Sequence, residues 1–143
     1  MKSTRILISV FLVTAAAFLS GCVTQLKSDI TPGTNLKALK TFYVVRLPAD
    51  QRGTDKLIAD RLSVMGYKAT SGEKSAVPGD VDAVVTYQDK WMWDITMYMI
   101  ELNVQVRQPK TEIALATGHS LRTSLVRKSP AAMVEEVLGD LFK

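Results

Sequence analysis

Three carboxylates, Asp89, Asp94 and Glu101, are the residues of this chain best suited to acid–base chemistry. They lie around one predicted β-hairpin, where two of them could approach each other. Paired carboxylates can divide the roles of acid and base when their surroundings separate their pKa values. The alternative is a charged, solvated face of the hairpin, and spacing along the sequence does not distinguish the two.

The only cysteine of the chain, Cys22, ends the segment Leu19-Ser20-Gly21-Cys22. A basic start and an apolar run from residue 6 to residue 19 come before it, in the order of a bacterial export signal. The segment resembles the lipobox of bacterial lipoproteins. This resemblance implies that residues 1–21 are a signal peptide that is removed, that the Cys22 sulfur carries diacylglycerol, and that the new amine carries an acyl chain such as palmitate.

Two alternatives to lipidation are an ordinary secretory signal, cut at Ala15-Ala16-Ala17 or after Gly21, and an uncleaved membrane anchor. The apolar run is shorter than the roughly 20 residues that span a bilayer, and a polar segment follows it. Val23, not aspartate, follows the cysteine, which in lipoproteins of two-membrane bacteria implies export to the outer membrane. We therefore expect a lipid-anchored protein at the periplasmic face of the outer membrane.

Other catalytic chemistry lacks the residues it needs. The chain has one histidine, His119, and its one cysteine is expected to be acylated. A Cys–His nucleophile pair and a His-rich zinc site are therefore excluded in practice. No Gly-x-Ser-x-Gly, P-loop or His-Glu-x-x-His segment occurs. We expect a protein that is not an enzyme and that uses neither a cofactor nor a metal.

The charge pattern gives no sign of a nucleic-acid surface. The full chain has 18 Lys plus Arg and 14 Asp plus Glu, but Lys2 and Arg5 leave with the signal peptide. The remaining charges are nearly balanced and interspersed, without a basic tract that contains aromatic residues. Because no second cysteine is present, the fold must depend on a packed core and not on a disulfide. The sequence does not indicate an oligomeric state.

Residues 22–40 are predicted to be the lipidated cysteine and a polar tether with a turn near Pro32, and residues 41–143 one folded domain. A strand is expected at 41–47, a helix at about 54–65, and a short strand at 67–70. This order implies a right-handed crossover between parallel strands.

From Val81 onward, apolar and polar residues alternate, as in half-buried strands. The alternation predicts three consecutive antiparallel strands, with a turn at residues 108–111 and a bulge at Gly118. Ser129 and Pro130 are suited to begin a final helix with an apolar stripe. The expected fold class is α+β: a two-layer sandwich with a βαβ start, an antiparallel meander and a C-terminal helix, and both helices on one sheet face.

The lipobox, the βαβ start with its Met65-Gly66-Tyr67 step, the meander and the Ser-Pro helix together resemble small bacterial outer-membrane lipoproteins. The layout is similar to envelope-assembly accessory lipoproteins, such as the lipopolysaccharide-assembly lipoprotein and the activators of penicillin-binding proteins. The resemblance implies a cell-envelope protein that acts by binding, as an accessory or structural partner in outer-membrane maintenance or assembly. One alternative is a lipoprotein that binds a small ligand or lipid in a groove between sheet and helices. A second is a carboxylate-dependent hydrolase.

Both tryptophans and three of the six methionines lie around one predicted hairpin. Alternate strand residues point to opposite faces, so some of these side chains are expected on the outer face or at the hairpin tip. Aromatic residues and methionine are enriched at protein interfaces. A hairpin covered by the tether or by loops is the alternative. The candidate interface with an envelope protein consists of Trp91, Met92, Trp93, Met97, Tyr98 and Met99.

Three basic residues near the end of the chain, Arg122, Arg127 and Lys128, are candidates for contact with anionic lipid. Proximity to the membrane supports this interpretation. A solvated strand end and loop is the alternative.

Overall fold

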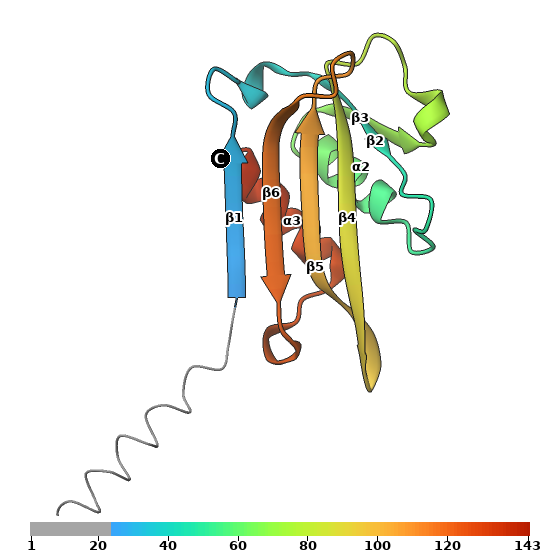
Figure 1. The fold of residues 1–143 in the computed structure, drawn as a ribbon, viewed down its shortest axis with the longest axis vertical. Helices are drawn as coiled ribbons and strands as arrows, with labels where there is room; N and C mark the ends of the chain where they lie inside the picture. Colours follow the sequence, from blue (N-terminus) through green and yellow to red (C-terminus); the bar gives the residue numbers. More distant parts are fainter. Residues whose placement is uncertain (1–23) are drawn as a thin grey trace, which may run out of the picture.

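The computed structural model describes residues 24–143, so Cys22 and the predicted signal peptide lie outside the described residues (Figure 1). The elements are, in chain order, β1 (Thr24–Ile30), η1 (Leu36–Ala38), β2 (Thr41–Val45), α2 (Thr54–Val64), β3 (Lys68–Gly72), η2 (Lys74–Ala76), β4 (Ala83–Asp94), β5 (Thr96–Arg107), β6 (Ala114–Arg122), η3 (Ser124–Val126) and α3 (Pro130–Leu141).

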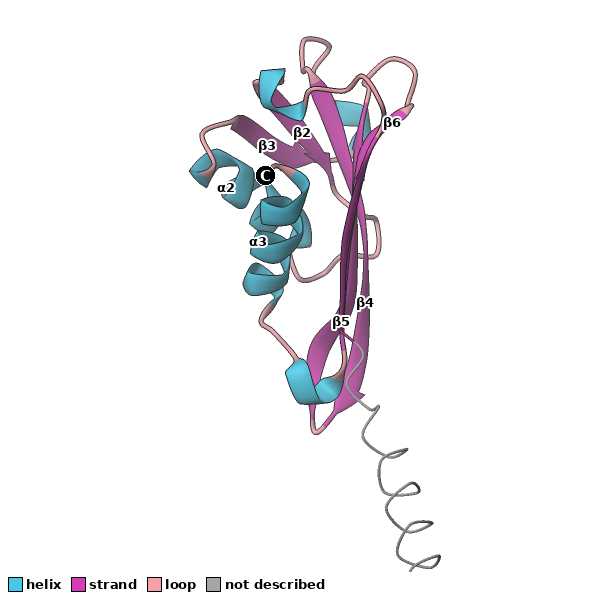
Figure 2. Ribbon diagram, turned by 90° about the vertical axis from the view of Figure 1, so that its left-hand side faces the viewer, coloured by secondary structure: helices cyan, strands magenta, loops and turns pink. Residues whose placement is uncertain are grey.

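Six strands form one mixed sheet in the order β1-β6-β5-β4-β2-β3. β2 runs parallel to both β3 and β4, as expected for a strand–helix–strand crossover, and the other neighbours are antiparallel. Both α2 and α3 pack on the same face of the sheet (Figure 2). Within residues 24–143 the other face, which we call the helix-free face, carries no α-helix. The predicted α+β two-layer fold is confirmed.

The N-terminal boundary of the domain differs from the sequence prediction. Residues 24–30 were expected in a tether, but they form edge strand β1, paired from Thr24 with Arg122 to Ile30 with Ala116. Edge strands are held largely by backbone hydrogen bonds, which nearly any sequence can supply, so β1 needs no clear apolar alternation. The folded domain therefore begins two residues after Cys22.

The core lies between the sheet and the two helices. Leu102, Val104 and Val106 of β5 are completely buried there, and so are Leu62 of α2 and Leu138 of α3. Burying an aliphatic side chain of this size contributes roughly 1.5–3 kcal/mol. The side chain of the cap residue of α3 accepts a hydrogen bond from a backbone N–H of the first turn, as its sequence predicted.

Gly118 of β6 is not at a bulge, contrary to the prediction. It pairs regularly with Val104 of β5 and Ser28 of β1. A Cβ at this position would lie 2.7 Å from Cγ1 of Val137 on α3. The glycine therefore allows the helix to approach the sheet closely.

The hairpin of β4 and β5 projects beyond the rest of the sheet. Gln25, Leu121, Glu101 and Lys90 are paired in one row across β1, β6, β5 and β4. Beyond this row the two hairpin strands continue to their last pair, Asp94 with Thr96. At about 3.3 Å per residue, the four to five further residues extend the hairpin by roughly 15 Å. We call residues 92–97 the hairpin tip.

The hairpin tip and the start of β1 lie at the same end of the molecule, which is the lower end in Figures 1 and 2. The end of β6 and the short helix η3 are also at this end. Within residues 24–143, no helix combines the length and the apolar character needed to cross a membrane.

Candidate functional site

The hairpin tip carries a cluster of exposed apolar side chains. Met92 is 47% exposed, Trp93 69%, Ile95 86% and Met97 44%. Leu125, which is 81% exposed, lies in η3 at the same end of the molecule. Apolar residues that gather on one projecting element of a folded domain often mark a contact with another molecule or with a membrane. The tip is therefore the candidate functional site.

The structure divides the predicted interface into exposed and buried residues. Met92, Trp93 and Met97 are exposed, whereas Tyr98 and Met99 are buried and Trp91 is half-buried against the core. Trp91 pairs with Met99 across the hairpin. The buried members stabilise the base of the hairpin, and only the exposed ones are available to a binding partner. That a partner protein binds here stays a prediction.

Ile95 occupies the turn of the hairpin tip in a costly backbone conformation. Its φ is 62°, in the left-handed region that β-branched residues rarely adopt. This conformation costs an L-residue roughly 1–2 kcal/mol. Because this side chain is exposed, it adds little packing energy that would offset the strain in the isolated domain. This combination favours a contact with another molecule as the reason for isoleucine at this position.

We expect Ile95→Gly to increase the free energy of unfolding of the domain by about 1 kcal/mol in the absence of membranes. Glycine adopts a positive φ without steric cost, and this gain exceeds the conformational entropy that glycine adds to the unfolded chain. Urea denaturation would measure the change. Ile95→Val is the matched control, because it keeps the β-branch and should give no increase. A loss of stability in Ile95→Gly would show that the isoleucine side chain supports the turn.

Polar contacts fix the base of the hairpin against α2. Nε1 of Trp91 and Oγ1 of Thr54 both donate hydrogen bonds to Oδ2 of Asp89, each at 2.9 Å. The guanidinium carbon of Arg52 lies 4.3 Å from the centre of the Trp91 ring, in a cation–π contact. The orientation of the hairpin is therefore tied to the start of α2.

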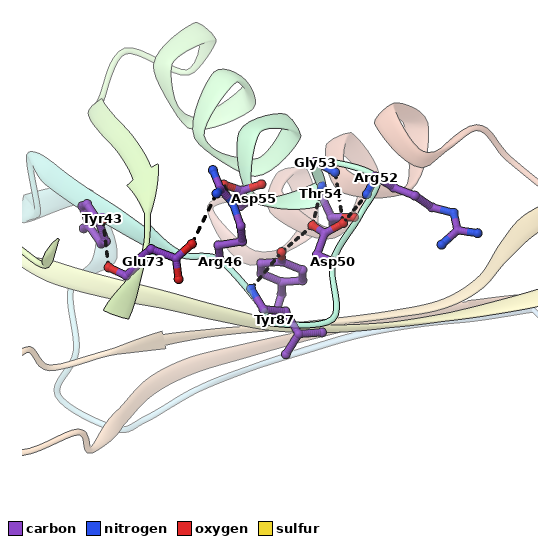
Figure 3. Close-up of polar contacts among 10 residues, drawn as sticks. Tyr43, Arg46, Asp50, Arg52, Gly53, Thr54, Asp55, Glu73 and Tyr87 are labelled. Atoms are coloured by element: carbon purple, nitrogen blue, oxygen red, sulfur yellow. Dashed lines mark hydrogen bonds and ion pairs between the residues drawn. The ribbon is translucent and has the colours of Figure 1, made fainter. Parts of the chain in front are cut away.

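Asp50 organises the start of α2 (Figure 3). Its carboxylate accepts hydrogen bonds from the backbone N–H groups of Arg52, Gly53 and Thr54, at 2.7, 3.0 and 2.7 Å. It also accepts one from the hydroxyl of Tyr87 on β4, at 2.6 Å. One side chain thus accepts hydrogen bonds from three backbone N–H groups at the start of the helix and just before it, and it connects that helix to the hairpin strand.

A second contact near the start of α2 connects it to β3 through the chain after β2. Nε of Arg46 donates to Oδ2 of the fully buried Asp55 at 3.2 Å, and an Nη of the same guanidinium lies 3.4 Å from Glu73 (Figure 3). This arrangement leaves α2 firmly attached to the sheet edge opposite β1.

The three candidate catalytic carboxylates do not converge. Asp89 faces α2, and Asp94 lies in the tip, 3.8 Å from Arg127. Glu101 lies on the helix-free face, where it is paired with Lys90 at 2.6 Å and Asn103 at 2.9 Å. These donors lower the pKa of Glu101. The carboxylate pair that the hydrolase interpretation requires is therefore not formed by these residues.

His119 lies on the helix-free face next to Glu101. Its Nε2 is 3.3 Å from Oε1 of that carboxylate. This places the histidine as a polar strand residue beside an existing ion pair.

Among residues 24–143, the space between sheet and helices, where the ligand-binding alternative placed a groove, is filled by completely buried side chains such as Ile58, Leu102 and Val137. A groove of about 580 Å³ lies instead on the helix-free face of the sheet. Polar residues line most of it: Thr86, Gln88, Lys90, Glu101, Asn103, Gln105 and Arg107.

The three basic residues near the end of the chain all have partners. Arg127 stacks over the ring of Tyr98 with 4.7 Å between guanidinium carbon and ring centre, and it donates to Oγ1 of Thr96 at 3.2 Å. Arg122 and Lys128 share the carboxylate of Glu136. The structure thus brings two of the predicted cations together and places the third beside the hairpin tip. Contact with anionic lipid stays a prediction.

The comparisons with known proteins concern the fold. No protein family model matches the sequence, and no curated protein matches it. A PelC dodecamer from Paraburkholderia phytofirmans has a TM-score of 0.59 at 12% identity, over 83% of this chain and 98% of that chain. A variant PelC dodecamer from the same organism has a TM-score of 0.61 at 10% identity, over 82% and 97%.

A DUF4136 family protein from Bacteroides thetaiotaomicron is also similar, with a TM-score of 0.50 at 11% identity, over 82% of this chain and 93% of that chain. At such identities the likeness shows a shared fold and no more. The similarity covers 93–98% of the length of these bacterial proteins, so the shared fold includes nearly all of each of them.

Sequence reasoning missed two parts of the site. Ile95 lies in the turn between the two alternating segments, so the alternation did not include it. The available signal was an apolar residue at the centre of a turn, where glycine, asparagine or aspartate is usual. No local sequence pattern indicated the contacts of Asp50 and Arg52 at the hairpin base, because their partners lie more than 30 residues away in the chain.

The contact of Glu136 with Arg122 and Lys128, at the hairpin end of the fold, is expected to be sensitive to acid. Burial alone would raise its pKa, but hydrogen bonds from Arg122 and Lys128 outweigh burial and lower it. A lowered carboxylate pKa stabilises the fold above the ordinary glutamate range, and this stabilisation is lost as the pH falls through the folded-state pKa.

We expect wild-type stability to fall on acidification from about pH 5, and Glu136→Gln to lack part of this decline. Thermal unfolding at a series of pH values would measure both. Glu135→Gln, on the neighbouring exposed residue, is the matched control, because it removes only a solvent-exposed ion pair with Arg61 at 3.1 Å and should keep most of the acid-induced decline. Identical profiles for Glu136→Gln and wild type would contradict the prediction.

Proposed function

We propose that this protein is a lipid-anchored protein of the bacterial envelope, held by acylated Cys22 at the periplasmic face of the outer membrane. It acts there by binding, as an accessory or structural partner in outer-membrane maintenance or assembly. One observation carries the proposal: the chain enters the fold at Thr24, at the same end as the exposed hairpin tip (Figure 1).

The short distance between Cys22 and the fold supports this orientation. Two residues of extended chain span at most about 7 Å, so the lipid can attach only close to the start of β1. The end of the molecule with the apolar tip then faces the membrane. The folds similar to this one belong to bacterial proteins, and this agrees with the setting that the lipobox implies.

A role in binding fits the arrangement of the polar residues better than catalysis does. Asp89, Asp94 and Glu101 each have their own partners and lie apart. The helix-free face, in contrast, offers an open polar groove of about 580 Å³. When the hairpin end faces the membrane, the plane of the sheet is roughly perpendicular to the membrane. The helix-free face is then accessible to a periplasmic partner.

Two measurements test the proposal. Mass spectrometry of the mature N-terminus should show an acylated Cys22, and an unmodified cysteine would contradict lipid anchoring. A photoreactive residue in place of Gln105, in the groove, should give a discrete protein adduct in native membranes. The matched control is the same residue in place of Asp60, on the exposed side of α2, which should give no such adduct. Absence of an adduct from the groove would contradict the binding role of this face.

Self-association is a second candidate function. Two of the similar structures are PelC dodecamers, and the described part of this chain forms a sheet whose two edge strands, β1 and β3, have no partner strand on their outer side. Unpaired strand edges can pair with further chains. Native mass spectrometry of the detergent-solubilised lipoprotein should then show a defined oligomer. A monomer at micromolar concentration would contradict this candidate.

A further inference from the structure

We propose that the hairpin tip inserts into the interfacial layer of the same membrane that holds Cys22, so that side chains act as a second anchor beside the lipid. This inference rests on the proposed function, because it requires that Cys22 is acylated. It identifies the lipid surface as what the exposed tip binds, and it implies a fixed orientation of the domain on the membrane.

Measured along the strand direction, the hairpin tip and Cys22 lie at similar heights, so both can reach the same membrane. From the row that contains Gln25 and Glu101, the tip projects by roughly 15 Å. From the same row, the three residues back to Cys22 extend at most about 11 Å. The end of the tip therefore lies at least about 4 Å beyond the backbone of the lipidated residue. Interfacial protein segments are buried by about 5–10 Å, so a Cys22 backbone at the membrane surface would place the end of the tip near this depth.

The chemistry of the tip suits the membrane interface. Its exposed apolar side chains are a tryptophan, two methionines and the isoleucine of the turn, beside the exposed polar residues Asp94 and Thr96. Tryptophan is enriched at membrane–water interfaces, where its ring is half in lipid and its N–H can bond to water or headgroups. Asp94 is the only charged residue of the segment 91–99, and Arg127 lies beside it. No unpaired charge of this segment opposes insertion.

Strain and surface area favour lipid over a protein partner. The unfavourable φ of Ile95 is retained in a turn that glycine would satisfy, and it presents a large apolar group at the outermost point of the fold. A stable protein interface takes about 800 Å² and 20–30 residues from each side. Four exposed apolar side chains at the end of two strands form a small projection, which is suited to insertion into a fluid layer.

Tryptophan fluorescence tests the proposal directly. The full lipoprotein with Trp91→Phe keeps Trp93 as its only tryptophan and can be reconstituted into phosphatidylethanolamine–phosphatidylglycerol vesicles. We expect lipids brominated near the carbonyl end of their chains to quench its emission, and aqueous iodide to quench it at least threefold less than a control. The control is Lys110→Trp with both native tryptophans replaced by phenylalanine, at the exposed turn between β5 and β6.

The complementary variant Trp93→Phe protects the test against a folding defect of Trp91→Phe. It keeps Trp91 and should lose most of the quenching by brominated lipid. Equal iodide quenching of Trp93 and of the Lys110→Trp reporter, in protein that is acylated and floats with the vesicles, would overturn insertion and leave the proposed function standing. Shielding from iodide without quenching by brominated lipid would also overturn it and assign the tip to a contact between copies of this protein. A protein without acyl groups would overturn both proposals.

Discussion

Asp50→Ala is expected to lower the free energy of unfolding by about 3 kcal/mol. Helix α2 has Gly53 at its N-cap, with a φ of 73° and no side chain to accept the free N–H groups. The carboxylate of Asp50 accepts them instead, and removal of such a cap costs about 1–2 kcal/mol. The hydroxyl of buried Tyr87 would also lose its acceptor, at a further cost of about 1–3 kcal/mol.

Urea denaturation of a double-mutant cycle would separate these two contributions. Tyr87→Phe removes the hydroxyl and should cost about 1 kcal/mol by itself. In the Tyr87→Phe background, Asp50→Ala should cost at least 1 kcal/mol less than in wild type, because no hydroxyl remains unsatisfied. Asp50→Asn keeps the shape and one acceptor and should be intermediate. Additivity of the two single changes within about 0.5 kcal/mol would show that the Tyr87 contact does not contribute.

The pH dependence of Asp50 follows from the same contacts. Burial alone would raise the pKa of Asp50, but the hydrogen bonds from Tyr87 and from three backbone N–H groups lower it. Its contribution to stability is therefore present above about pH 4 and is lost as the pH falls through the lowered folded-state pKa. The difference between wild type and Asp50→Ala should shrink in that acidic range.

Elements with local signals were predictable from the sequence. Helix α3 has a cap residue, Ser129, a proline in its first turn, and an apolar stripe at helical spacing, all within a dozen residues. The expected hydrogen bond from the backbone N–H of Ala132 to the Ser129 hydroxyl is present at 3.2 Å. Strand β1 had no such signal, because its partner β6 lies more than 80 residues away and its own side chains are mostly exposed.

The faces of the hairpin were not predictable, because a bulge changes the alternation. The pairing register shifts between Lys90 and Trp91, so Ile100 is left without a partner on β4. As a result, Met99 lies on the same face as Trp91 and is completely buried. Uninterrupted alternation would have placed it on the opposite face. An extra residue in one strand leaves no mark in the apolar pattern until the partner strand is known.

Gly118→Val is expected to lower the free energy of unfolding by about 3 kcal/mol, because the position is filled by α3. A Cβ at residue 118 would lie 2.7 Å from Cγ1 of Val137, 3.6 Å from its carbonyl oxygen and 3.8 Å from Cδ2 of Leu141. Val137 is β-branched and has essentially one side-chain rotamer in a helix, so it cannot turn aside. The helix itself would have to move off β6, and overpacking of this kind typically costs 1–3 kcal/mol or more.

The side chain of Val137 provides the control for this prediction. Val137→Ala alone should destabilise the domain by about 1–3 kcal/mol, because it leaves a cavity in the core. In combination with Gly118→Val, the total loss should be smaller than the sum of the two single losses by more than 1 kcal/mol, since the new methyl groups occupy the vacated space. Chemical denaturation of the four proteins would measure this coupling. If the losses simply add, α3 is free to shift on the sheet, and the glycine is not what sets the distance between helix and strand.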